Sequence, residues 1–341
     1  MLHLSTVSSK AAHEAYREPS PEPYPFVVKS VIVHRLHKRR AAPQPRTAPR
    51  ISRWLHPLSV LCALQLTLAA SYLLPGDVKP SHYDVRLLYD VDPATNYSFY
   101  GVVDITRISL TGGNEPLSVN DVKLNETYNL LTLELDRELQ QSENYILTIP
   151  FFGNLKPGLD GVYISNYVNK DTNNKEYLIA TQFEATSARK GFPCFDEPLY
   201  KATFRITIGH HTSYTAVSNM PLEKASDDKL NSVPMSTYLV AFVVSKFSYV
   251  ESPAHLSKTK FKIWARSDAI DQTSYAATVG PKVLTHFEEW FNVSFPLPKQ
   301  DMIAIPDFSA GAMENWGLIT YRETALLYDK EQSSFLNKER L

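Results

Sequence analysis

The sequence has too few cysteines to support a disulfide-bonded framework. Its 341 residues include only Cys62 and Cys194. Because Cys62 lies in an apolar run, we expect Cys194 to be an unpaired thiol that behaves as a small buried apolar side chain rather than as a nucleophile. Cysteine usage therefore does not indicate the compartment in which the protein works.

Most of the chain also lacks a net positive charge. The formal net charge is −1, but residues 1–57 carry 10 Lys and Arg against 3 Asp and Glu, whereas the remaining residues carry 25 against 33. This acidic balance argues against nucleic-acid binding. Residues 1–53 are basic and rich in proline, which removes backbone donors and restricts the preceding residue, so we predict a disordered tail. A solvated tail explains its basic run at 37–40 better than a nucleic-acid patch does.

One uncharged stretch, residues 54–76, is long and apolar enough for export or anchoring. Arg50 and Arg53 precede it, and Ala69 and Ser71 place small residues where a signal peptidase cleaves. Two hypotheses stay open for 54–71: a cleaved signal behind a mispredicted start, or an uncleaved anchor with a basic cytoplasmic tail. We favour the cleaved signal; a buried core helix is the third alternative.

Either of the two main hypotheses exports the rest of the chain, to the extracellular space or the cell surface. Three glycosylation sequons, at Asn96, Asn125 and Asn292, agree with export. Each sequon alone is a weak signal, because the pattern arises often by chance. Membrane association is left open by the anchor hypothesis.

Period-two alternation of polar and apolar residues dominates the middle of the chain and predicts half-buried antiparallel strands. The fold class is therefore mainly β, with an N-terminal antiparallel β saddle or sandwich over residues 72–260. No internal repeat is visible. The predicted strands lie at 83–87, 101–108, 131–135, 145–149, 204–208 and 238–244.

The pattern changes after residue 260. A strand at 261–265 precedes a helix predicted over 271–291, where apolar residues recur three or four apart. Pro281 falls inside that helix and is expected either to kink it or to start it. Two further strands, at 302–305 and 318–321, lead us to predict that a second domain opens at residues 261–341.

The segment between these last two strands holds the run Gly311-Ala312-Met313-Glu314-Asn315. Small residues between strands let another backbone approach closely, and an extended peptide can add to such an edge. Glu314 stands where it can meet a cation. Taken alone, these five residues are better explained as an ordinary loop with a solvated glutamate.

A family resemblance favours the functional interpretation. Residues 309–323, 181–198 and 72–84 resemble, in the same order and spacing, three blocks of the zinc aminopeptidases related to aminopeptidase N, the gluzincins with the Gly-Ala-Met-Glu-Asn motif. The resemblance covers residues 72–341. It implies that 261–341 is the incomplete start of an α+β, thermolysin-like catalytic domain.

The resemblance also implies roles for particular residues, with peptides that have a free N-terminus as the partners. Two carboxylates would bind the α-amine, three backbone residues would align the peptide as an added strand, and one amide would line the first subsite. The two carboxylates are Glu184 and Glu314, the amide is Gln182, and the backbone residues are Gly311, Ala312 and Met313. Residues 192–198 are expected to form a packed turn that supports the strand before them.

The zinc site of that family is not found in the sequence. Its relatives hold zinc with two His and one Glu, but His286 is the nearest approach to the His-Glu-x-x-His pattern, and no second His follows it. The pair His210-His211 is expected in a turn and has the wrong spacing. We therefore predict no catalytic and no metal-binding residue here, and a chain that is the inactive amino-terminal part of a zinc-binding parent.

The alternative is a short product that acts as a catalytically inactive peptide-binding or surface-receptor module. Against it, apolar residues of the 271–291 helix and of the strands near Met302 would lack a covering partner and form a large exposed patch.

Overall fold

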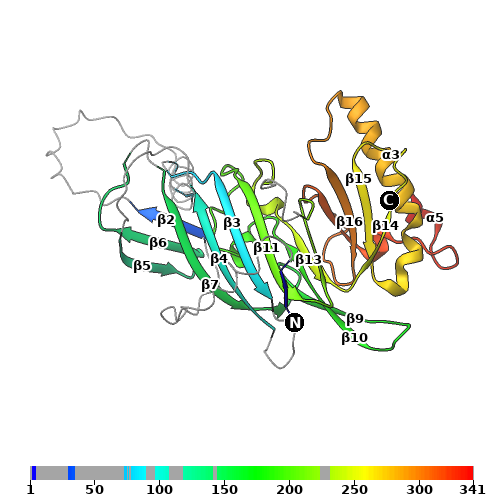
Figure 1. Cartoon of the computed structure of the whole chain (residues 1–341), viewed down its shortest axis with the longest axis horizontal. Helices are drawn as coiled ribbons and strands as arrows, with labels where there is room; N and C mark the ends of the chain where they lie inside the picture. The colour runs from blue at the N-terminus through cyan, green and yellow to red at the C-terminus, as the bar shows by residue number, and fades with distance from the viewer. Residues whose placement is uncertain are drawn as a thin grey trace, which may run out of the picture.

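The computed structural model describes residues 2–4, 30–34, 73–74, 76, 78–89, 97–106, 118–140, 144–222 and 231–340. Its strands form four sheets, and the sheet with β2, β5 and β6 and the sheet with β14, β15 and β16 lie at opposite ends of the long axis (Figure 1). Most pairings are antiparallel. The predicted mainly β fold is confirmed.

The first two sheets form the N-terminal β domain. The first has the order β1-β11-β3-β4-β7 and the second the order β12-β13-β10-β9-β8. Contrary to the antiparallel prediction, β3 and β11 run parallel. The strands are β1 (Leu2–Leu4), β3 (His82–Tyr89), β4 (Ser98–Thr106), β7 (Ile146–Asn154), β8 (Lys156–Pro157), β9 (Gly161–Val168), β10 (Lys175–Gln182), β11 (Thr203–His211), β12 (Thr215–Ser218) and β13 (Phe242–Ser245).

The third sheet has the order β14-β15-β16-β18-β17 and a parallel centre formed by β15, β16 and β18. Its strands are β14 (Ser248–Glu251), β15 (Lys260–Ala265), β16 (Lys299–Ile305), β17 (Ala312–Met313) and β18 (Leu318–Arg322). The sheet therefore begins at Ser248, ahead of the domain boundary predicted at residue 260. The domain limits themselves remain a prediction.

A helical crossover joins β15 to β16 and packs against the third sheet (Figure 1). It consists of the 3₁₀ helix η4 (Ser267–Thr273) followed by α3 (Ser274–Phe291), which confirms the predicted helix. Pro281 lies within α3 and does not start it. Asn292 ends the helix in the left-handed conformation, with φ 51°, which asparagine tolerates better than most residues. Two short helices follow β18, namely α4 (Glu323–Leu326) and α5 (Phe335–Arg340).

A small fourth sheet has the order β2-β6-β5, with β2 (Ser30–His34), β5 (Val119–Asn125) and β6 (Leu130–Leu135). Both β1 and β2 belong to the segment predicted to be a disordered tail, and their backbones pair with β11 and β6. The rest of residues 1–53 and the predicted signal or anchor at 54–71 lie outside the described residues.

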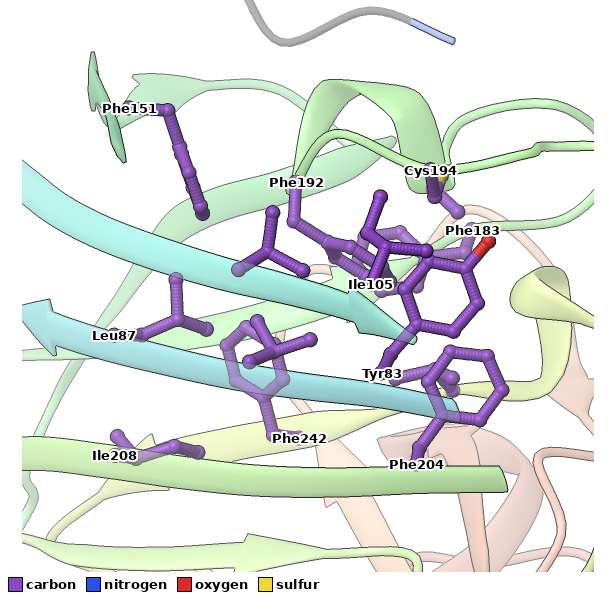
Figure 2. Close-up of a cluster of buried hydrophobic side chains, with 14 of the residues drawn as sticks. Tyr83, Leu87, Ile105, Phe151, Phe183, Phe192, Cys194, Phe204, Ile208 and Phe242 are labelled. Carbon is purple, nitrogen blue, oxygen red and sulfur yellow. The ribbon is translucent and has the colours of Figure 1, made fainter. Parts of the chain in front are cut away.

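Aromatic side chains fill the core between the first two sheets (Figure 2). Alternate residues of β3 are buried, as period two requires, and Tyr83 stacks on Phe204 with ring centroids 4.9 Å apart. The hydroxyl of Tyr83 accepts a hydrogen bond from the backbone N–H of Phe195 at 3.1 Å. This bond links β3 to the turn at residues 192–198.

That turn is held by a buried ion pair. The Arg189 Nε donates to Asp196 Oδ2 at 2.8 Å, and the Thr237 hydroxyl donates to Asp196 Oδ1 at 2.7 Å. Phe192 and Cys194 point into the aromatic core (Figure 2) and are almost fully buried. The prediction of a packed, architectural turn after the strand is confirmed.

Two details of the sequence prediction were wrong. Residues 238–244 are not one strand: the 3₁₀ helix η3 (Thr237–Leu239) comes first and β13 begins only at Phe242. The strand near Met302 is not exposed, because every residue of β16 is buried. On α3, however, the predicted apolar exposure is present: Trp290 is 74% exposed, and Phe287 and Phe291 are exposed beside it.

Replacing Arg189 by Met is expected to lower the free energy of unfolding by about 3–5 kcal/mol, because it leaves the buried Asp196 carboxylate without its charged partner. Chemical denaturation of the 341-residue chain measures this. Lys123→Met is the matched control, since its pair with Glu134 is on the surface and its loss is expected to change little. Equal midpoints for the two variants would contradict the assigned role of Arg189.

Candidate functional site

The strand β17 lies at one edge of the third sheet and coincides with the Gly-Ala-Met-Glu-Asn run. It pairs only with β18 in the part of the chain that the structure describes, through Ala312 opposite Tyr321 and Met313 opposite Thr320. Gly311 and Ala312 are exposed, and a Cβ built on Gly311 would have no atom within 4 Å. The outer edge of β17 is therefore open to an approaching backbone.

Buried neighbours on both sides of Glu314 fix its position. The Met313 side chain is 1% exposed and belongs to the cluster between the second and third sheets. The Asn315 side chain is equally buried, and its Nδ2 donates to the Thr320 hydroxyl at 3.1 Å. Glu314 itself is exposed, with neither a hydrogen bond nor an ion pair to any described residue. Its carboxylate is free to meet an external cation.

The other two predicted polar residues lie at the end of β10. Gln182 is only 7% exposed, yet its Oε1 has no hydrogen-bond partner among the described residues. A buried acceptor without a partner is costly, so it marks a place where a ligand donor would be stabilising. Glu184 follows the strand and is exposed; the peptide bond between it and Ala185 is cis.

The register of β9 and β10 brings this strand end towards the loop before β17. Tyr163 of β9 lies opposite Ala180, and Gln182 lies two residues further along β10, about 7 Å at the usual strand rise. The Tyr163 hydroxyl donates to the backbone oxygen of Asp307 at 3.0 Å. Ala180 and Met313 also belong to one buried cluster. No direct hydrogen bond joins Gln182 or Glu184 to residues 311–314 within the described parts of the chain.

The backbone directly after the Gly-Ala-Met-Glu-Asn run is closely packed at Gly317. Gly317 has φ +83°, and a Cβ at this position would lie 2.1 Å from the backbone oxygen of Asn219. The Asn219 Nδ2 donates to the Trp316 oxygen at 2.8 Å. The buried Lys299 ammonium donates to the Gly317 oxygen at 2.8 Å and to Asp301 Oδ2 at 2.9 Å. Burial lowers the pKa of Lys299, and the Asp301 carboxylate opposes that shift.

Comparison with known proteins identifies the family. Residues 103–239 match the Peptidase M1 N-terminal domain, and residues 275–341 match the Peptidase family M1 domain. The chain belongs to the peptidase M1 family. Two of the three predicted blocks of resemblance, 181–198 and 309–323, fall within these matches, whereas 72–84 precedes them.

Among curated proteins, the M1 chain is similar to aminopeptidase A of Gloydius brevicauda, with 39% identity over 300 residues, covering 80% of this chain and 31% of the relative. It is 40% identical over 299 residues to glutamyl aminopeptidase of Bitis rhinoceros, covering 79% and 31%. It is 35% identical over 361 residues to aminopeptidase N of Homo sapiens, covering 92% and 37%. The chain spans about a third of the length of these relatives.

M1 aminopeptidases are zinc-dependent in general. Within the described residues, however, no three His, Cys, Asp or Glu side chains are grouped so that they could hold a metal ion. His286 lies on α3, and His210 and His211 end β11 rather than lying in the turn that was predicted.

Two further findings concern export. No helix in the described ranges is long and apolar enough to cross a membrane. Asn125 and Asn292 are both exposed, at the end of β5 and after α3, whereas Asn96 lies outside the described residues. Glycosylation at these sequons stays a prediction.

No motif in the sequence marks the residues whose side-chain hydrogen bonds hold the segments before and after β17, which are Tyr163, Ser165, Asn219, Lys299, Asp307 and Arg322. Each acts through a partner that is distant in sequence, so no local pattern marks it. Lys299 and Asp301 come closest to being recognisable from the sequence, because they are opposite charges two residues apart beside an apolar run.

Gly317→Ala is expected to destabilise the chain strongly. The left-handed backbone alone costs about 1–2 kcal/mol, and the clash with Asn219 adds to it. Thermal unfolding measures the loss, with Gly311→Ala as the matched control because an added Cβ has open space there. An unchanged Tm for Gly317→Ala would contradict the close packing of Gly317 against the Asn219 backbone.

Cys194 is expected to resist alkylation in the folded chain. Burial raises the pKa of this thiol, the nearby Asp196 carboxylate adds to that shift, and Arg189 opposes it. Iodoacetamide at pH 8, followed by peptide mass spectrometry, should leave Cys194 unmodified in the native state and modify it in urea. Rapid native labelling would contradict the assignment of Cys194 as a buried structural residue.

Proposed function

We propose that this chain recognises the free N-terminus of peptides and contributes that recognition to a zinc-dependent aminopeptidase, an enzyme that removes N-terminal residues. Glu184 and Glu314 bind the substrate α-ammonium group. Gly311, Ala312 and Met313 align the peptide beside β17, and Gln182 lines the first subsite.

The single observation that carries this proposal is the exposed Glu314 carboxylate at the end of an open edge strand. An extended peptide that pairs with β17 brings its N-terminal ammonium to that end of the edge, where a charge-assisted hydrogen bond is available. An internal peptide bond has no ammonium to offer. Such a site therefore selects chain ends over chain interiors.

Gln182 supports the same interpretation from the N-terminal domain. Its buried Oε1 has no partner among the described residues, so a donor from a bound peptide would satisfy it. Glu184, two residues later, is exposed and is not part of an ion pair in the described structure. One domain thus contributes an amide and a carboxylate, and the other contributes a carboxylate and a strand edge.

We also propose that the protein works outside the cell or at its surface. The exposed sequon residues Asn125 and Asn292 support this.

The test compares two peptides that differ only at the N-terminus. A C-terminally labelled tri-alanine peptide is titrated with the 341-residue chain, with the amine free or acetylated, and the Kd is read by fluorescence polarisation. Acetylation, Glu314→Gln and Glu184→Gln are each expected to weaken binding about 10- to 100-fold, because each removes a charged hydrogen bond.

Glu289→Gln is the matched control, since Glu289 is an exposed glutamate on α3, which packs near the opposite edge of the third sheet. Equal affinity for the free and acetylated peptides would reject amine recognition. A loss of binding in Glu289→Gln as large as that in Glu314→Gln would indicate a general charge effect and not a site.

A further inference from the structure

We propose that the N-terminal β domain positions the amine-recognition strand directly, with Tyr163 and Ser165 of β9 as positioning residues that hold Asp307. The inference rests on the proposed function, because it concerns the same strand, β17. Two hydroxyl groups of the N-terminal domain thus fix the position of a peptide-binding strand edge that belongs to the other domain.

The contact from β9 is formed by two hydrogen bonds to a single residue. The Tyr163 hydroxyl donates to the Asp307 backbone oxygen at 3.0 Å, and the Ser165 hydroxyl donates to Asp307 Oδ2 at 2.8 Å. Tyr163 and Ser165 are both 1% exposed. They are two residues apart on β9, so they point to the same face and reach the same loop.

The protonation state of Tyr163 suits this role. Burial raises the pKa of its phenol, and the Asp307 carboxylate raises it further. Both effects favour the protonated phenol, which is the form that donates the hydrogen bond to Asp307.

The opposite side of the same loop is held by β18. The Arg322 Nε donates to the Phe308 oxygen at 3.0 Å, and its Nη2 donates to the Ser309 oxygen at 2.5 Å. The backbone N–H of Arg322 donates to the Gly311 oxygen at 3.0 Å. Arg322 belongs to the same sheet as β17, so by itself it fixes the loop only relative to its own domain.

The two sets of contacts have different consequences. Asp307 lies four residues before Gly311, and the loop between them carries the chain from β16 to the open edge. Arg322 fixes the far end of that loop, and β9 fixes its beginning against the domain that holds Gln182 and Glu184. Without the β9 contact, the segment before β17 would lose its two hydrogen bonds to the domain that holds Gln182 and Glu184, and only the contacts of Met313 and Trp316 would still tie the strand to that domain.

The experiment uses Tyr163→Phe, Ser165→Ala and the double variant in the 341-residue chain. Tyr200→Phe and Ser236→Ala are matched controls, because each removes a buried hydroxyl that donates to a backbone oxygen within the N-terminal domain, to Leu74 at 3.0 Å and to Pro198 at 2.8 Å. Thermal unfolding of all variants reports general destabilisation.

The first readout is hydrogen–deuterium exchange of residues 306–316. We expect exchange there to become about 3- to 10-fold faster in the double variant, as the loss of one or two hydrogen bonds allows, with no change in the controls. The second readout is the ratio of Kd values for acetylated and free tri-alanine. This ratio should fall about 3- to 10-fold in the double variant and stay constant in the controls.

A coupling test gives a third readout. Ser165→Ala should have no further effect in the Asp307→Ala background, because the carboxylate that it serves is already gone. Exchange rates and Kd ratios in the double variant equal to those of the controls would overturn the proposal. If the wild-type chain itself fails to distinguish the two peptides, the proposed function fails, while the exchange comparison still decides whether β9 positions the loop.

Discussion

The site depends on one apolar cluster that is buried between two sheets. Leu178 and Ala180 of β10 lie on one side of it, and Ile303 and Met313 lie on the other. Since interiors are packed to near-crystalline density, such a cluster fixes the separation of the sheets to within a fraction of an ångström. The distance between Glu314 and the pair Gln182 and Glu184 therefore depends on how this cluster packs. Positions at the edge are thus set by packing in the interior.

Hydrogen bonds at the rim of the cluster fix the orientation of one sheet relative to the other. Apolar packing is not directional, so it fixes the distance between two sheets more firmly than their rotation. Hydrogen bonds from Asn219 to Trp316 and from Ser165 to Asp307 cross the boundary at separate points. Their acceptors lie before and after β17. The strand is therefore fixed at both of its ends.

The sequence predicted local features well and long-range ones poorly. Alternation located β3 and β6, and helical spacing located α3, because each pattern reflects one buried face. It did not reveal β5, whose residues are exposed on both faces and so do not alternate. It began β16 at Met302 although the strand starts at Lys299, because a buried Lys–Asp pair looks like a surface segment. The family motif directs attention to the candidate residues Glu184 and Glu314, whereas residues that hold the neighbouring segments through distant partners, such as Tyr163, are recognisable only in the folded structure.

The two-residue length of β17 has a consequence for solubility. An open strand edge in a β protein invites pairing with other edges, and long flat edges promote aggregation. At β17 the exposed ladder is too short to template another strand of ordinary length, and Glu314 places a charge at its end. This edge therefore offers little to a second sheet, although it leaves room for the short end of an extended peptide of the kind proposed above.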